Sequence, residues 1–262
     1  MPSRVIEVAL IIAIGSIAIA LAYTYLLPLL LTTFQTVDVK ALESNYKQLL
    51  VILDEEGSIK SVYYIKFTNF HEVDKAQAYG MYYQIDFNLD GENLQDIKIP
   101  TMSINSNISN YGGFPWINLI GDNRTYALLN KSSFVISGFK YDNNYIYMLY
   151  ARPSIYILEE EISDKVSIFR IFIMFDKYVL KSSSGVLNEI LIGKDTKISV
   201  EVTSILKYPP LVWGSEKILN LKISQLCPFF KRDDNIAIGN KEKMNIYEVH
   251  IKIINKNVII GD

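Results

Sequence analysis

Residues 8–31 of the chain read VALIIAIGSIAIALAYTYLLPLLL and contain no charged side chain. At 1.5 Å per residue, a helix of this length spans roughly 36 Å, enough to cross a hydrocarbon core of about 30 Å with some tilt. A cleaved secretory signal has a shorter apolar region, of roughly 7–15 residues, and a small-x-small cleavage site. We therefore interpret residues 1–31 as a retained N-terminal membrane anchor whose partner is the lipid bilayer.

The flanks of this segment predict its orientation. Arg4 and the amino group precede it, whereas Thr32–Asp38 contains no Lys or Arg. Because positively charged flanks stay on the cytoplasmic side, we expect a single-pass protein of the cell membrane with a cytoplasmic N-terminus. The C-terminal domain would then be extracellular.

The composition of the 262-residue chain favours a folded β domain after the anchor. Half of the residues are hydrophobic, and 18 Tyr and 12 Phe stand against only 8 Pro and 13 Gly. Aromatic and β-branched side chains suit the half-buried surface of a sheet. A net charge of −2 without a basic cluster argues against nucleic acid as a partner. The lone Cys227 lies in an apolar setting and cannot form an intrachain disulfide.

Alternating apolar and polar residues predict strands throughout residues 51–262. About twelve strands are expected, and they are Leu50–Asp54, Ile59–Phe67, Tyr79–Leu89, Ile97–Ile104, Phe134–Lys140, Tyr145–Tyr150, Val166–Leu180, Glu189–Ile192, Lys197–Leu206, Ile218–Ile223, Asn245–Ile254 and Val258–Ile260. The fold class is therefore mainly β, with an N-terminal transmembrane helix followed by one or two β-sandwiches. A subdivision of this domain is possible near residues 182–185.

Residues 32–50 are either a linker or an amphipathic extension of the helix. Apolar residues recur there at near-helical spacing, namely Phe34, Val37, Ala41, Leu42, Tyr46, Leu49 and Leu50. Pro28 and the β-branched residues after it disfavour a continuous helix. We favour a short linker, with one long helix from Val5 to about Leu50 as the alternative.

The run Ser3–Ile14, SRVIEVALIIAI, resembles the start of archaeal type IV pilin-like proteins, which carry class III signal-type N-termini. Those proteins begin with a short basic leader and an apolar helix rich in Ile, Leu and Ala. The resemblance implies that the helix packs in a filament core, where Glu7 can pair with the N-terminal amine of a neighbour. The chain lacks the small residue that usually follows the basic one, here Arg4, and this departure favours an uncleaved signal anchor.

Small residues on the apolar helix are candidates for self-association. Ala13, Ser16 and Ala20 let the backbones of neighbouring helices approach closely. Glu7 lies at the membrane edge, where a carboxylate requires a charged partner or the interface.

Three sequons fall in one stretch of the proposed ectodomain, at Asn107, Asn123 and Asn130. Such triplets accept glycans only if they are extracellular and exposed, and they also arise by chance in an Asn-rich chain.

Asp86, Asn88 and Asp90, followed by Gly91, resemble the first half of a calcium loop. The twelfth position of such a loop should supply a bidentate carboxylate, and here it is Ile97. The simpler interpretation is a strand that ends in an Asp-Gly turn. No metal and no other cofactor is therefore predicted.

No catalytic residue is predicted, because none of the common nucleotide, hydrolase, metalloprotease or redox motifs occurs. His71 and His250 are far apart in sequence. The aromatic, proline-containing segments Phe114–Trp116 and Tyr208–Trp213 can either contact a partner or cover the core.

These features predict a non-enzymatic, membrane-anchored structural protein of the cell surface. It would be a pilin-like filament subunit or a filament-associated stator or adhesion component, with self-association or other surface proteins as partners. If the N-terminus is processed, the protein would belong to an extracellular filament. The alternative is a signal-anchored ectoenzyme or solute-binding ectodomain.

Protease added to intact cells should degrade the chain beyond Leu31 and leave the short N-terminal tail protected. Mass spectrometry of the surviving peptides checks this topology. Protection of the whole β region would contradict the orientation argued from the flanking charges.

Overall fold

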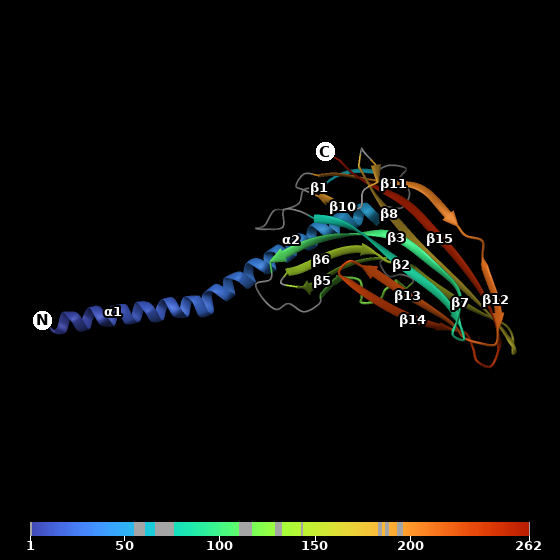
Figure 1. Ribbon diagram of the computed structural model, residues 1–262, viewed down its shortest axis with the longest axis horizontal. Coiled ribbons are helices and arrows are strands. Elements are labelled where there is room, and N and C mark those ends of the chain that lie inside the picture. The colour runs from blue at the N-terminus through green and yellow to red at the C-terminus, as the bar shows by residue number, and fades with distance from the viewer. Residues whose placement is uncertain are drawn as a thin grey trace.

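The computed structural model describes residues 2–54, 61–65, 76–109, 117–128, 133–142, 144–182, 185–186, 189–192 and 196–261. One long N-terminal helix leads into a β domain built from two sheets (Figure 1). The chain is thus mainly β with one N-terminal apolar helix, as the sequence predicts.

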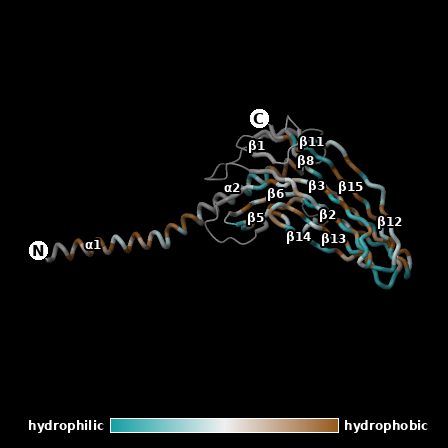
Figure 2. The backbone as a smooth tube through the Cα atoms, in the orientation of Figure 1, coloured by the Kyte–Doolittle hydropathy of each residue, from teal (hydrophilic) through white to brown (hydrophobic). Residues whose placement is uncertain are grey.

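The helix runs without a break from Pro2 to Asp54. It comprises α1 (Pro2–Leu21), a π-helical turn η1 (Ala22–Leu26) and α2 (Leu27–Asp54). Val8–Leu31 is long and apolar enough to cross a membrane, and the rest of the described chain buries none of it. Figure 2 shows this part of the helix in predominantly hydrophobic colours.

The linker favoured for residues 32–50 is wrong, because α2 continues through them. The π turn directly precedes Pro28, and the N–H of Leu27 donates to the carbonyl of Ala22 five residues back. Such a turn absorbs the missing donor and the bulk of a proline ring. Farther on, the Thr33 hydroxyl donates to the Leu29 carbonyl at 2.8 Å, so this β-branched residue joins the helix.

The first sheet has the strand order β1-β11-β15-β8-β7, with β12 paired to β15 and β9 paired to β8. Its strands are β1 (Ser61–Ile65), β7 (Ser154–Ser163), β8 (Val166–Ser182), β9 (Gly185–Val186), β11 (Thr196–Lys207), β12 (Leu211–Ser215) and β15 (Met244–Gly261). The two long strands β8 and β15 are parallel neighbours.

The second sheet has the order β14-β13-β2-β3-β6-β5-β4, with β10 paired to β2. Its strands are β2 (Ala76–Leu89), β3 (Glu92–Ser109), β4 (Ile117–Ile120), β5 (Phe134–Tyr141), β6 (Asn144–Ala151), β10 (Glu189–Ile192), β13 (Leu219–Cys227) and β14 (Phe230–Ile238). Neighbouring strands in this sheet are antiparallel.

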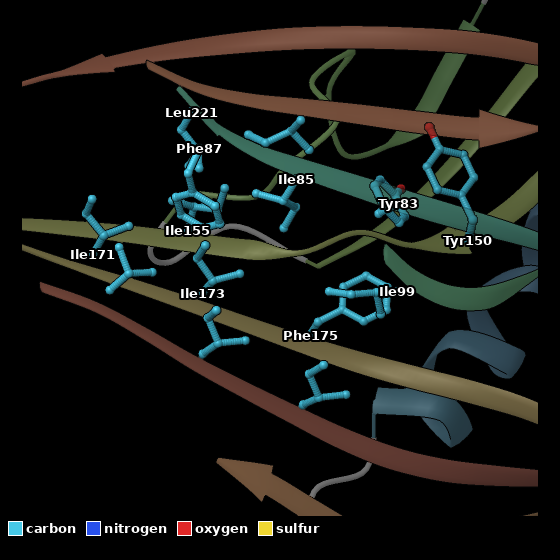
Figure 3. Close-up of a cluster of buried hydrophobic side chains, with 14 of the residues drawn as sticks. Tyr83, Ile85, Phe87, Ile99, Tyr150, Ile155, Ile171, Ile173, Phe175 and Leu221 are labelled. Carbon is cyan, nitrogen blue, oxygen red and sulfur yellow. The ribbon is translucent and has the colours of Figure 1, made fainter. Parts of the chain in front are cut away.

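One hydrophobic core joins the two sheets (Figure 3). Alternate residues of β2 and β8 point into it, for example Tyr83, Ile85, Phe87, Ile171, Ile173 and Phe175. The rings of Tyr83 and Phe175 meet edge to face across the sheets with centroids 5.5 Å apart. Because a single cluster spans both sheets, the described strands form one sandwich. Ser182 and Gly185 pair within the first sheet, so residues 182–185 connect β8 to β9.

Local turn signals are confirmed where the structure describes them. Strands β2 and β3 meet at Asp90 and Gly91, both with positive φ, and β5 and β6 meet at Asp142, also with positive φ. Residues 50–54, by contrast, were expected to be the first strand of a hairpin and instead form the end of α2.

A truncated protein that begins at Phe34 should be soluble without detergent and should give a β-dominated circular dichroism spectrum. The reason is that it keeps Tyr46, Leu49 and Leu53, which α2 buries against the sandwich. A second truncation that begins at Gly57 removes these side chains and should aggregate or unfold. Aggregation of the longer protein, or a mainly helical spectrum, would contradict a self-sufficient β domain.

Candidate functional site

The best-defined site is the junction where the end of α2 enters the sandwich. Tyr46, Leu49 and Leu53 lie on one face of the helix at spacings of three and four residues, and all three side chains are buried. By contrast, apolar residues near the start of the helix, such as Ile11, stay exposed. The helix therefore has a free apolar part and a docked part.

The docked part covers a second buried face of the second sheet. Along β3, β5 and β6, the residues that alternate with the core residues are buried as well, namely Met102, Ile104, Phe134, Ile136, Tyr147 and Leu149. Strands β5 and β6 are consequently covered on both faces. A sheet face that holds so many apolar side chains must be shielded from water, and α2 supplies the cover.

A buried phenol fixes the helix to this face. The Tyr46 Oη lies 2.9 Å from Ser106 Oγ and 3.2 Å from the carbonyl oxygen of Tyr147, so its hydrogen can donate to either one. Burial raises the pKa of Tyr46 well above its ordinary value, although the hydrogen bond to Ser106 acts in the opposite direction. The phenol is therefore a neutral donor at physiological pH.

The first sheet holds the last turn of the helix through a polar clamp, formed by Leu53, Asp176, Tyr178 and Lys256. The Leu53 carbonyl oxygen accepts hydrogen bonds from Tyr178 Oη at 3.0 Å and from Lys256 Nζ at 3.1 Å. Lys256 is 1% exposed and forms an ion pair with Asp176 at 2.8 Å. Its Nζ also lies 5.5 Å from the centroid of the Tyr178 ring.

Helix geometry explains this choice of partners. The last carbonyls of an α-helix have no partner within the helix, and the C-terminus carries a partial negative charge. A lysine ammonium and a phenol satisfy both requirements at Leu53. Because a buried ammonium is costly unless it is paired, Asp176 completes the clamp. The arrangement holds the helix end against the first sheet.

The structure places Asp86 and Asn88 on the outer face of β2, where they alternate with core residues. Asp90 and Gly91 form the turn between β2 and β3, and Asp90 makes an ion pair with Lys217. The Asp-Gly turn that the sequence suggested for this stretch is confirmed. Among the described residues, no group of three or more His, Cys, Asp or Glu side chains is placed to hold a metal.

The three sequons lie in different settings. Asn107 is in β3, and Asn130 lies outside the described residues. Asn123 is exposed, but Thr125 of the same sequon is fully buried, and its N–H donates to Asp234 Oδ2 at 2.6 Å. A glycan on Asn123 would have to be attached before this segment folds.

The residues predicted to mediate helix assembly lie in α1. Ala13, Ser16 and Ala20 are exposed to solvent at spacings of three and four residues, so they share one side of the helix. The Ser16 hydroxyl donates to the Ile12 carbonyl at 2.8 Å and leaves no unsatisfied donor. Glu7 belongs to the same helix, and its side chain lies outside the described part of the structure.

Of the two aromatic, proline-containing segments, the structure describes the second. Phe114–Trp116 lies outside the described residues, as does His71. In the second segment, Trp213 packs against the core with its ring 5.7 Å from that of Phe87, whereas Tyr208 is 46% exposed. This segment thus both covers the core and presents an aromatic side chain to solvent.

Cys227 is partly buried and packs against the core. Burial raises the pKa of its thiol to about 11. The thiol therefore stays protonated at neutral pH and behaves as a small apolar group.

Comparisons of the chain with protein-family models, curated proteins and solved structures find no match.

Sequence reasoning missed the clamp. Tyr178 and Lys256 lie 125 and 203 residues from Leu53 along the chain. The one available signal is the polar run Asn255–Asn257, which interrupts an otherwise apolar, alternating stretch.

Replacing Lys256 by Met should lower the free energy of unfolding by about 3–5 kcal/mol, because it leaves Asp176 without its buried partner. Tyr178→Phe removes one neutral hydrogen bond and should cost about 1 kcal/mol. Urea denaturation of the Phe34 truncation measures both changes. Lys222→Met, which breaks a half-exposed pair with Asp233 at 3.9 Å, is the matched control and should cost less than about 1 kcal/mol. Equal effects of Lys256→Met and Lys222→Met would contradict a structural role for the clamp.

Proposed function

We propose that this protein is a membrane-anchored structural subunit of the cell surface, either a pilin-like filament subunit or a filament-associated component. The observation that carries the proposal is the continuous helix from Pro2 to Asp54, whose first part has no protein cover and whose last turns are locked into the sandwich. A free apolar helix requires lipid or other helices around it.

The rigid junction supports a structural role. A simple anchor can carry its domain on a flexible linker, because it only has to keep the domain near the membrane. Here α2 leads directly from the apolar segment into buried contacts with both sheets. A force or a rotation applied to the helix is therefore passed to the sandwich, as an assembled subunit requires.

The N-terminal resemblance to archaeal pilin-like proteins supports the same proposal. In such an assembly the helices pack side by side, and the sandwiches form the outer layer. The exposed stripe of Ala13, Ser16 and Ala20 allows close approach of helices, and the charge bias at the N-terminus favours an extracellular sandwich.

Added bulk on the small-residue stripe should weaken self-association. Ala13→Leu and Ala20→Leu keep the helix apolar, but they hold neighbouring backbones apart, so cross-linking yields in native membranes should fall several-fold. Glu7→Gln should also lower the yield, since it removes the charge that a neighbour's amine would pair with.

Ala18→Leu is the matched control. Ala18 lies with Gly15 and Ala22 on the opposite side of the helix from the stripe, so the same added bulk there should lower the yield less than in the stripe variants. Carbonate extraction should recover all four variants in the membrane fraction. Yields that stay unchanged in the stripe variants and in Glu7→Gln would mean that the helix only anchors, and the filament proposal would then be dropped.

A further inference from the structure

The outer face of the first sheet carries a groove of about 330 Å³ that the proposed assembly does not use. Its floor consists of Phe172 and Met174 on β8 and of His250 on β15, which alternate with core residues on the same strands. The volume is at the lower end of the range for small-molecule sites.

One wall of the groove is a stiff arch between two strands that pair with β15. Lys207 of β11 is paired with Lys252, and Leu211 of β12 is paired with Val249. The residues between them, Tyr208–Pro210, leave the sheet. The arch is fixed by its two prolines and by the Tyr208 N–H, which donates to the Ile251 carbonyl at 3.1 Å. A wall that is already ordered adds little entropic cost to binding.

The floor presents ring edges to a ligand. Tyr156, Phe172 and His250 occupy paired positions on β7, β8 and β15. Their rings form a stacked row, with centroids 6.0 Å apart for the first pair and 4.9 Å for the second. Rings stacked face to face turn their edges outward, and ring edges carry partial positive charge.

The two lysines that line the groove have the same sign, and the carboxylate of Glu248 lies beyond the lining, 4.0 Å from His250 Nε2 and paired with Arg170 at 3.0 Å. Lys207 and Lys252 line the groove, and no Asp or Glu is among its described lining residues. A ligand that fits must therefore supply an apolar body for the floor and a negative group for the two ammonium groups. A sugar is a poorer match, because sugar hydroxyls are commonly bound by carboxylate and amide side chains, and the described lining has neither.

We propose that this groove binds a small aromatic carboxylate, with its ring against Phe172, Met174 and Tyr208 and its carboxylate between Lys207 and Lys252. A membrane surface is the less suitable source of negative charge. Figure 1 places β12, which follows the arch, at the end of the sandwich far from the N-terminal part of the helix.

The proposal can be tested on the full-length protein in lipid nanodiscs with ¹³C-labelled methionine methyl groups. Met174 is 43% exposed and lines the groove, so its signal reports binding there directly. Titration with 1-naphthoate should shift this signal saturably, with a Kd of about 1 mM. The neutral 1-naphthalenemethanol and the ringless anion acetate should bind at least about tenfold more weakly.

Lys207→Gln and Lys252→Gln should each weaken naphthoate binding about 3- to 10-fold, and Tyr208→Ala should weaken it by a similar factor. Lys231→Gln, on the outer edge of the second sheet, is the charge-matched control and should change nothing.

Equal binding of the alcohol and the carboxylate, or unchanged binding in both groove lysine variants, would overturn the proposal. A Met174 signal that depends on protein concentration but not on naphthoate would overturn it too, and would instead indicate contact with a second copy. None of these outcomes bears on assembly through the helix, which Ala13→Leu and Ala20→Leu test separately.

Discussion

The docking of the last turns of α2 against both sheets is the constraint on which the rest of the structure depends. A helix end cannot be buried unless its free carbonyl groups find donors. Here Lys256 and Tyr178 supply two of them to one carbonyl, and Asp176 keeps the buried ammonium paired. Because α2 is continuous with the apolar segment, the clamp also fixes how the sandwich is held relative to the start of the chain.

The docking of α2 also explains why the outer faces of the two sheets differ. Strands β5 and β6 bury residues on both faces, since α2 covers the face away from the core. Near the arch, the outer face of the first sheet instead leaves apolar side chains such as Tyr208 and Val212 exposed. The outer face of the second sheet thus forms the junction with α2, whereas the outer face of the first sheet carries the groove.

The errors made from the sequence have particular physical causes. Pro28 and the threonines after it argue for a break when each residue is judged alone, but a π turn accommodates the proline and a hydroxyl-to-carbonyl hydrogen bond accommodates Thr33. Strand β14 escaped notice because Lys231–Asp234 places charges on both of its faces, which hides the alternation, as suits an edge strand. Strand β15 was split at Asn255–Asn257, where a polar run reads as a turn, yet Lys256 is buried there because it reaches the end of the helix.

The sequence by itself determined the features that depend on neighbouring residues. These are the apolar helix, the β character of the remainder, and the turns at Asp90-Gly91 and Asp142, all of which follow from composition, periodicity and local backbone preference. Only the tertiary structure decided the clamp, the cover over β5 and β6, and the groove. Each of these joins residues far apart in the chain, such as Leu53 and Lys256. Periodicity assigns a residue to a face of a strand or a helix, but it does not say which distant element covers that face.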